Sequence, residues 1–169
     1  MIVFLSAYPA LAGVLLFAAV GKVRDVRGFA RSIGNYRILP RRLTIPAAAV
    51  TVAAELVAAV LLVVPATRRW GAATAAVLFA AFLVAMATAV RRGLRIDCGC
   101  FGGPDSSDLV GPGTMTRTGL LLALAVPAAV AGTSAFSPVH LVLSALLLCL
   151  VMVTSEVVKA LAEPAGAGG

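Results

Sequence analysis

The chain has 169 residues, of which 61% are hydrophobic and 12% are charged, and its mean hydropathy is +1.04. In soluble domains about a quarter of the residues are charged, so this composition argues against a soluble protein. It predicts an all-α integral membrane bundle of four to five transmembrane helices. The net charge of +7 does not indicate nucleic-acid binding, because the basic residues form short runs beside apolar segments and only 6% of residues are aromatic. The lipid bilayer is therefore the predicted partner, with no nucleic acid.

Five apolar segments approach the length that about 30 Å of hydrocarbon requires. We expect them at residues 2–20, 43–64, 71–90, 118–134 and 139–158. The fourth is the weakest, since it is short and contains Pro127. No basic residue precedes the first segment, which favours a retained helix over a signal peptide. Residues 1–162 are expected to form a single membrane domain, and the Ala, Gly and Pro-rich residues 163–169 a disordered tail.

Segment 23–42 combines an apolar face with a basic face. Four apolar residues and three arginines recur at near-helical spacings: Val26, Phe29, Ile33 and Tyr36, and Arg24, Arg27 and Arg31. This pattern predicts a short amphipathic helix in the membrane interface. An ordinary polar loop stays open as an alternative, because Gly28 and Gly34 weaken a helix. The other long polar stretch, residues 91–117, is turn-rich and includes Gly111-Pro112-Gly113.

The basic residues also predict an orientation. Residues 22–42 contain seven Lys and Arg residues and residues 91–117 contain four, whereas residues 65–70 contain only Arg68 and Arg69. Two spans separate the first two loops, so both lie on one side of the membrane. By the positive-inside rule that side is cytoplasmic, and the N-terminus is outside.

The sequence Asp97-Cys98-Gly99-Cys100-Phe101-Gly102 follows the third span. Two thiols one residue apart can close a small strained ring, and strained disulfides are the ones that exchange. Arg92 and Arg95 lie close by in the sequence, and guanidinium groups favour the attacking thiolate. The pair is thus a candidate redox centre.

Other interpretations of the two cysteines remain open. They can be reduced and idle, or they can bind a soft metal ion such as zinc or Cu(I). A closed zinc site needs four ligands, and the only histidine in the sequence is His140. His140 is predicted near the face of the membrane opposite to the two cysteines, so we predict no metal site. Cys149 lies within an apolar run, where it is expected to act as a small hydrophobic residue.

Glu55 is the ionisable residue of the second span, about twelve residues from its start and therefore near mid-membrane at about 1.5 Å per residue. Such a group usually faces the bundle interior with a partner. Two roles stay open: proton handling, or a packing role that fixes helix contacts. Lys22 can reach Glu55 along the first helix, or it can snorkel to the interface.

Taken together, these residues resemble the methylamine-utilisation protein MauE family of small membrane proteins, which is related to the DoxX-like group. The resemblance runs over about residues 21–121 and is strongest at Asp97–Gly102 after Arg92-Gly93. It also covers Gly21-Lys22, Phe29, Tyr36, Leu39-Pro40 and Glu55. Where the family commonly has Arg-Asn before the next helix, this chain has Arg117-Thr118.

The resemblance implies thiol and disulfide chemistry beside a thioredoxin-like partner. For the members that gave the family its name, it implies that they assist the maturation of the disulfide-rich small subunit of methylamine dehydrogenase. By similarity, Cys98 and Cys100 would be the redox pair of a thiol-disulfide oxidoreductase, and a membrane quinone is the electron acceptor that we consider. This expectation conflicts with the orientation, since disulfide formation in exported proteins occurs on the oxidising side of the membrane.

Two further hypotheses belong to other functional classes. The chain could be a non-catalytic scaffold that recruits a partner through its basic loops, with incidental cysteines. It could also be a small-molecule carrier built around Glu55, although no matching halves or broken helices are evident in the sequence.

Overall fold

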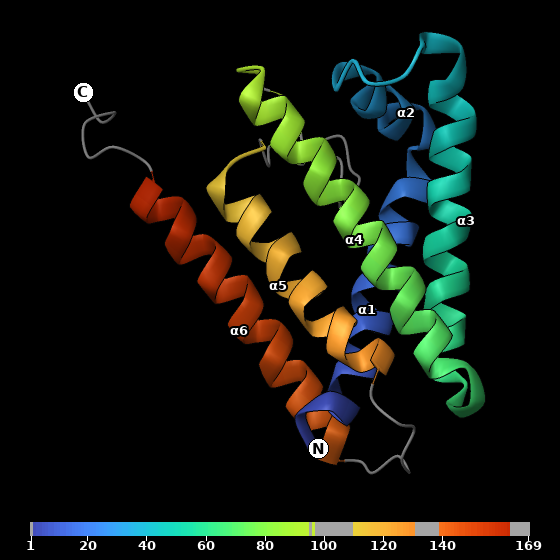
Figure 1. Cartoon of the computed structure of the whole chain (residues 1–169), viewed down its shortest axis with the longest axis vertical. Helices are drawn as coiled ribbons and strands as arrows, with labels where there is room; N and C mark the ends of the chain where they lie inside the picture. Colours follow the sequence, from blue (N-terminus) through green and yellow to red (C-terminus); the bar gives the residue numbers. More distant parts are fainter. Residues whose placement is uncertain (1, 95, 97–109, 131–138, 163–169) are drawn as a thin grey trace.

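The computed structural model describes residues 2–94, 96, 110–130 and 139–162; the elements among them are all helices joined by short turns, with no strand (Figure 1). The tail 163–169 lies outside the described residues. In chain order the elements are α1 (Ile2–Arg24), α2 (Val26–Asn35), the 3₁₀ turn η1 (Arg41–Leu43), α3 (Thr44–Val63), the 3₁₀ turn η2 (Pro65–Thr67), α4 (Arg68–Arg91), α5 (Pro112–Val130) and α6 (Val139–Ala162).

Helix α1 lies inside the bundle. It packs chiefly against α3, α5 and α6, while α3 packs on α4, α4 on α5 and α5 on α6. The short α2 sits at the end of the bundle where α1 ends and α3 begins (Figure 1). We call this the α2 end, and the other, where α3 meets α4, the Arg68 end. Buried residues of α1, α3, α4, α5 and α6 form one apolar core along the bundle.

The described part of the chain has four helices that are long and apolar enough to cross a membrane. They are Ala7–Arg24, Arg41–Val63, Pro65–Arg91 and Pro112–Val130, and a shorter apolar helix covers Leu143–Thr154. The predicted all-α membrane bundle is therefore confirmed, and the fourth segment is long enough to span despite Pro127.

The start of α5 differs from the sequence-based expectation. The turn-rich loop was predicted to continue to residue 117, but α5 begins at Pro112. Proline suits the first helical position, where its missing N–H costs nothing and its fixed φ favours the helix. The backbone N–H of Gly111 also donates to Thr114 Oγ1 at 3.0 Å. Arg117, expected in the loop, is therefore a buried residue of α5.

The amphipathic helix predicted within segment 23–42 is confirmed as α2. Asp25 caps it by accepting a hydrogen bond from the Gly28 backbone N–H at 2.8 Å. A side chain at Gly28 would place its Cβ 2.0 Å from an oxygen of that carboxylate, which explains a glycine inside this helix. The apolar face packs on α3: Phe29 and Ala30 form a cluster with Ala48 and Val52.

Helices α3 and α4 approach each other closely through small residues. Gly71, Ala72 and Ala75 of α4 are buried. A Cβ at Gly71 would lie 2.7 Å from the backbone nitrogen of Leu62 in α3. Only glycine permits this contact, which is the usual way that membrane helices pack tightly.

Candidate functional site

The α2 end of the bundle contains a buried ion pair. Lys22, near the end of α1, donates a hydrogen bond to Oε1 of Glu55 in the middle of α3. Both side chains are almost fully buried, at 0% and 1% exposure. Of the two placements that the sequence left open for Lys22, the structure has the one in which it reaches Glu55.

Two aromatic rings complete the surroundings of the Lys22 ammonium. Its nitrogen lies 5.1 Å from the ring centroid of Phe29 in α2 and 5.1 Å from that of Phe82 in α4. The negative ring faces attract a cation, most strongly where water is excluded. Lys22 thus joins α1 to α2, α3 and α4. Phe82 was not singled out in the sequence, because its place beside Lys22 depends on how α4 packs.

The second carboxylate oxygen of Glu55 makes no hydrogen bond within the part of the chain that the structure describes. Most buried polar side-chain atoms have a hydrogen-bond partner. The pair is therefore held by one strong charge-assisted contact and by ring faces, not by a wider polar network.

An apolar cavity of about 530 Å³ lies beside the ion pair. Phe29 and Phe82, the two rings around Lys22, form part of its wall together with residues of α2, α3, α4 and the stretch after α2. The remaining lining residues are Ile33, Tyr36, Ile38, Leu39, Ala47, Thr51, Ala80, Ala81, Val84 and Ala85. A cavity of this size and character suits an apolar molecule or side chain.

The chain enters and leaves segment 97–109 at one point of the α2 end. The backbone N–H of Val110 donates to the carbonyl oxygen of Ile96 at 2.8 Å. Leu94, Ile96 and Val110 pack on a buried cluster of Tyr36, Met86 and Ala89, and Phe82 packs on the same cluster. The residues that flank the cysteine segment are therefore connected to the ion pair through Phe82.

Arg92 follows the last residue of α4 and is exposed. Its guanidinium donates to the carbonyl oxygen of Arg37 at 3.3 Å. Arg37 has a φ of 52°, in the left-handed region that non-glycine residues seldom adopt. This contact links the end of α4 to the turn after α2, so Arg92 has a structural contact in addition to the electrostatic role predicted for it.

Most residues of the predicted thiol centre lie outside the described residues. These are Arg95, Asp97, Cys98, Gly99, Cys100, Phe101 and Gly102. The structure brings Lys22 and Glu55 together. Ile96 and Val110, which flank the cysteine segment 97–109, are anchored at the same end of the bundle. Cys149 is a free, exposed residue of α6, and among the described residues no three His, Cys, Asp or Glu side chains gather as metal ligands.

The Arg68 end has a second buried cation in different surroundings. Arg68, the first residue of α4, is buried and its guanidinium carbon lies 5.8 Å from the Tyr8 ring centroid. The Tyr8 hydroxyl donates to the Ala128 carbonyl oxygen at 2.8 Å, which joins α1 to α5. From the sequence, Arg68 was expected to be a loop charge, and Tyr8 was not predicted as a site residue. The signal for Tyr8 was its place among the apolar residues of the first span.

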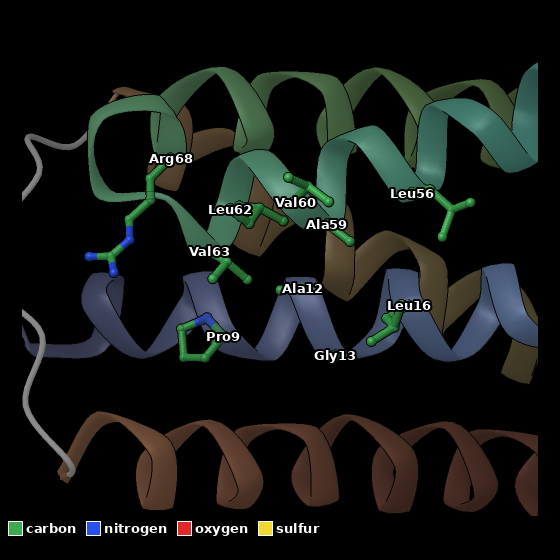
Figure 2. Close-up of a pocket in the computed structure, with 10 residues that line it drawn as sticks. All are labelled: Pro9, Ala12, Gly13, Leu16, Leu56, Ala59, Val60, Leu62, Val63 and Arg68. Atoms are coloured by element: carbon green, nitrogen blue, oxygen red, sulfur yellow. The ribbon is translucent and has the colours of Figure 1, made fainter.

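A groove of about 640 Å³ runs between α1 and α3 from Arg68. Figure 2 shows Arg68 extending toward α1 beside Pro9 at one end of the groove, with Leu16 and Leu56 at the other. Apart from Arg68 its wall is apolar. The groove lies at the end of the bundle away from Ile96 and Val110, so it is not part of the region around the cysteine segment.

The family model described as "Methylamine utilisation protein MauE" matches residues 1–132. A Methylamine utilization protein MauE of Methylophilus methylotrophus is 35% identical over 159 residues, which cover 90% of this chain and 83% of that protein. One of Paracoccus denitrificans is 39% identical over 92 residues, or 54% of this chain and 50% of that protein. No solved structure gives a significant match. The chain therefore belongs to the MauE family of membrane proteins.

Proposed function

We propose that this chain is a membrane thiol-disulfide component that acts in methylamine utilisation and exchanges disulfides with a thioredoxin-like partner. Family membership supports the pathway, since the relatives are named for methylamine utilisation. One observation carries the chemistry: two cysteines one residue apart fall in a segment whose flanking residues, Ile96 and Val110, are hydrogen-bonded at an end of the bundle. A redox pair for a visiting protein needs such a fixed attachment near the membrane surface.

The proposed exchange conserves atoms and electrons without a further oxidant or reductant. A thiolate of one protein attacks the disulfide of the other, which forms a mixed disulfide and releases one thiolate. The neighbouring thiolate of the attacking protein then displaces the remaining sulfur. One protein ends with a disulfide and the other with two thiols, so two electrons have moved. The same steps run in either direction, and the relative reduction potentials of the two proteins decide which.

We further propose that the α2 end faces the cytoplasm and that the N-terminus lies outside. Exposed arginines of the α2 end support this orientation, because cytoplasmic loops are enriched in Lys and Arg. In this orientation Cys98 and Cys100 would meet a cytoplasmic thioredoxin-like protein. Membrane-impermeant thiol reagents applied from each side would test the orientation: labelling of the pair from the non-cytoplasmic side alone would contradict it.

Lys22 and Glu55 are proposed as supporting residues of this function. The ion pair and the anchors of the cysteine segment share Phe82, which touches the ammonium and packs on the cluster below Ile96 and Val110. Loss of the pair should therefore loosen the base of the segment. A partial loss of exchange rate in a Glu55→Gln variant that still folds would support this role.

Mixed-disulfide trapping tests the function. The parent is a Cys149→Ser variant, which removes the exposed cysteine of α6. The bait is a thioredoxin-like protein that lacks its own resolving cysteine and carries thionitrobenzoate in a mixed disulfide on the remaining one, so that an attacking thiolate displaces thionitrobenzoate. Single Cys98→Ser and Cys100→Ser variants separate the attacking thiol from the resolving one: we expect the complex to accumulate in one and to be lost in the other. The double variant should trap nothing. Equal trapping by both single variants, or trapping by neither, would refute the proposal and favour a scaffold with incidental cysteines.

A further inference from the structure

A cavity of about 760 Å³ at the α2 end is lined by three arginines. Arg27 and Arg31 come from α2 and Arg41 from η1, and the first residues of α3, Thr44 and Ile45, also line the cavity. We call it the basic cavity. It is separate from the apolar cavity beside the Lys22–Glu55 pair and from the groove in Figure 2, which have no lining residue in common with it.

The packing of α2 fixes the position of these arginines. Residues four apart lie on the same side of a helix, so Arg27 and Arg31 are neighbours. The apolar face of α2 is held against α3 by Phe29 and its cluster, and Asp25 caps the start of the helix. Since α2 cannot turn without losing these contacts, its two arginines stay beside the turn that carries Arg41.

The cavity carries an excess of positive charge. Residues 22–42 contain seven basic residues and one acidic residue, Asp25. Asp25 lies 4.0 Å from Arg31, and both side chains are solvent-accessible, so the contact is weak. Among the described residues, the buried carboxylate of Glu55 is already paired with Lys22. Three guanidinium groups around one hollow therefore favour an anionic occupant, above all a phosphate group, which arginine binds through paired N–H donors.

The position along the bundle indicates where this phosphate comes from. The cavity lies at the first turn of α3, where the span Arg41–Val63 starts. The ends of spanning helices lie at the depth of lipid headgroups. Ile45 lines the same cavity and is 62% exposed. An occupant that touches three arginines on one side and an exposed isoleucine of a spanning helix on the other needs a charged head and an apolar chain.

We propose that the basic cavity is a binding site for an anionic phospholipid, with the phosphate held by Arg27, Arg31 and Arg41 and the start of an acyl chain against Ile45. The volume suits a headgroup, since small-molecule sites usually measure about 300–1,000 Å³. The site is independent of disulfide exchange. A lipid bound there would brace α2 against the start of α3, at the end of the bundle that carries the cysteine segment.

Lipid binding to the full-length protein in detergent tests the proposal, with native mass spectrometry as the readout. The probes are phosphatidylglycerol and phosphatidylcholine of the same acyl chains. The cavity variant is Arg27→Gln/Arg31→Gln/Arg41→Gln. The control variant, Arg24→Gln/Arg37→Gln/Arg42→Gln, removes the same charge from exposed arginines of the same segment that do not line the cavity.

We expect the parent and the control to bind phosphatidylglycerol with similar affinity and to prefer it over phosphatidylcholine. The cavity variant should lose about a hundredfold in phosphatidylglycerol affinity, since it loses three direct contacts to the phosphate and each contributes roughly a factor of five. An Arg27→Lys/Arg31→Lys/Arg41→Lys variant should retain part of it, because lysine keeps the charge but not the paired donors. Melting curves check that all variants fold.

Three results would overturn the proposal. Equal losses in the cavity and control variants would mean that charge acts diffusely, without a site. Unchanged phosphatidylglycerol binding by the cavity variant would mean that the arginines bind no lipid. Unchanged lipid binding together with lost recruitment of an acidic or thioredoxin-like protein would make the cavity a protein-docking surface instead.

Discussion

The two ends of helix α1 each bury a cation, and they stabilise it in different ways. At the α2 end Lys22 contacts a carboxylate and two phenylalanine rings from three other helices. At the Arg68 end the guanidinium of the first residue of α4 lies over a tyrosine ring, beside an open apolar groove (Figure 2). Glu55 lies in the middle of α3, where a buried charge needs a counter-charge, whereas Arg68 is the first residue of its helix.

The comparison also separates two kinds of structural support. The α2 end depends on charge, through the ion pair and the arginines around the basic cavity. The Arg68 end depends on close backbone packing at Gly71 and on the hydrogen bond of Tyr8. Variants at each end should therefore differ in how much stability they lose and in whether a second substitution restores it.

The largest loss is expected for Glu55→Leu. It leaves the Lys22 ammonium buried without a counter-charge, and breaking a buried pair in this way costs about 3–5 kcal/mol. Thermal unfolding in detergent would show a much lower Tm. The double variant Lys22→Met/Glu55→Leu should recover most of the loss, because no charge then remains buried. A double variant as unstable as the single one would mean that shape, not charge, governs this end.

A smaller loss is expected for Gly71→Ala at the other end. The added Cβ would meet the backbone of α3 at 2.7 Å, and such overpacking costs about 1–3 kcal/mol. Gly119→Ala is the matched control, since a Cβ there has no neighbour within 4 Å. The control should be neutral or more stable by up to about 1 kcal/mol, because alanine favours a helix. Equal effects of the two alanines on Tm would contradict the close contact between α3 and α4.

Tyr8→Phe should cost about 1 kcal/mol, since it removes the hydrogen bond to Ala128 and keeps the ring under Arg68. Tyr8→Leu removes the ring as well and should lose roughly 0.5–1 kcal/mol more. Chemical denaturation of both variants measures these steps. If Tyr8→Phe were as stable as the parent, the hydroxyl would contribute nothing to the junction of α1 and α5.

The smallest effect is expected for Arg92→Gln. Its hydrogen bond to the Arg37 carbonyl is long and exposed, so the stability change should stay within about 0.5 kcal/mol. The disulfide-exchange rate is the informative measurement for this variant. A fall in rate without a change in Tm would support the electrostatic role predicted for Arg92 beside the cysteine segment.

Much of the architecture could be predicted from the sequence, because long apolar segments have few stable arrangements in lipid. The spans, the amphipathic α2 and the interior position of Glu55 follow from periodicity and hydropathy. The start of α5 was misplaced because Gly111-Pro112-Gly113 is typical of a turn, while proline also opens helices. Arg68 was assigned to a loop for a similar reason: basic residues at a span's edge fit either a loop or the first helical turn.

The candidate site was less predictable. The sequence identified Glu55 and offered Lys22 as its partner, but the contribution of Phe82 depends on how α4 rotates against α1. The hydrogen bond between Ile96 and Val110 joins residues on either side of a long segment, and no local pattern encodes such a closure. The basic cavity likewise arises only when Arg41 meets two arginines of α2.

The most direct test of the account measures the redox state of Cys98 and Cys100. The Cys149→Ser protein is equilibrated in thiol-disulfide buffers of graded potential, alkylated and weighed by mass spectrometry. We predict a reversible transition in which two thiols are lost together, with a midpoint between about −270 and −120 mV, the range of thioredoxin-like proteins. Two thiols that remain reactive at every potential in that range would contradict the assignment of the pair as a redox centre.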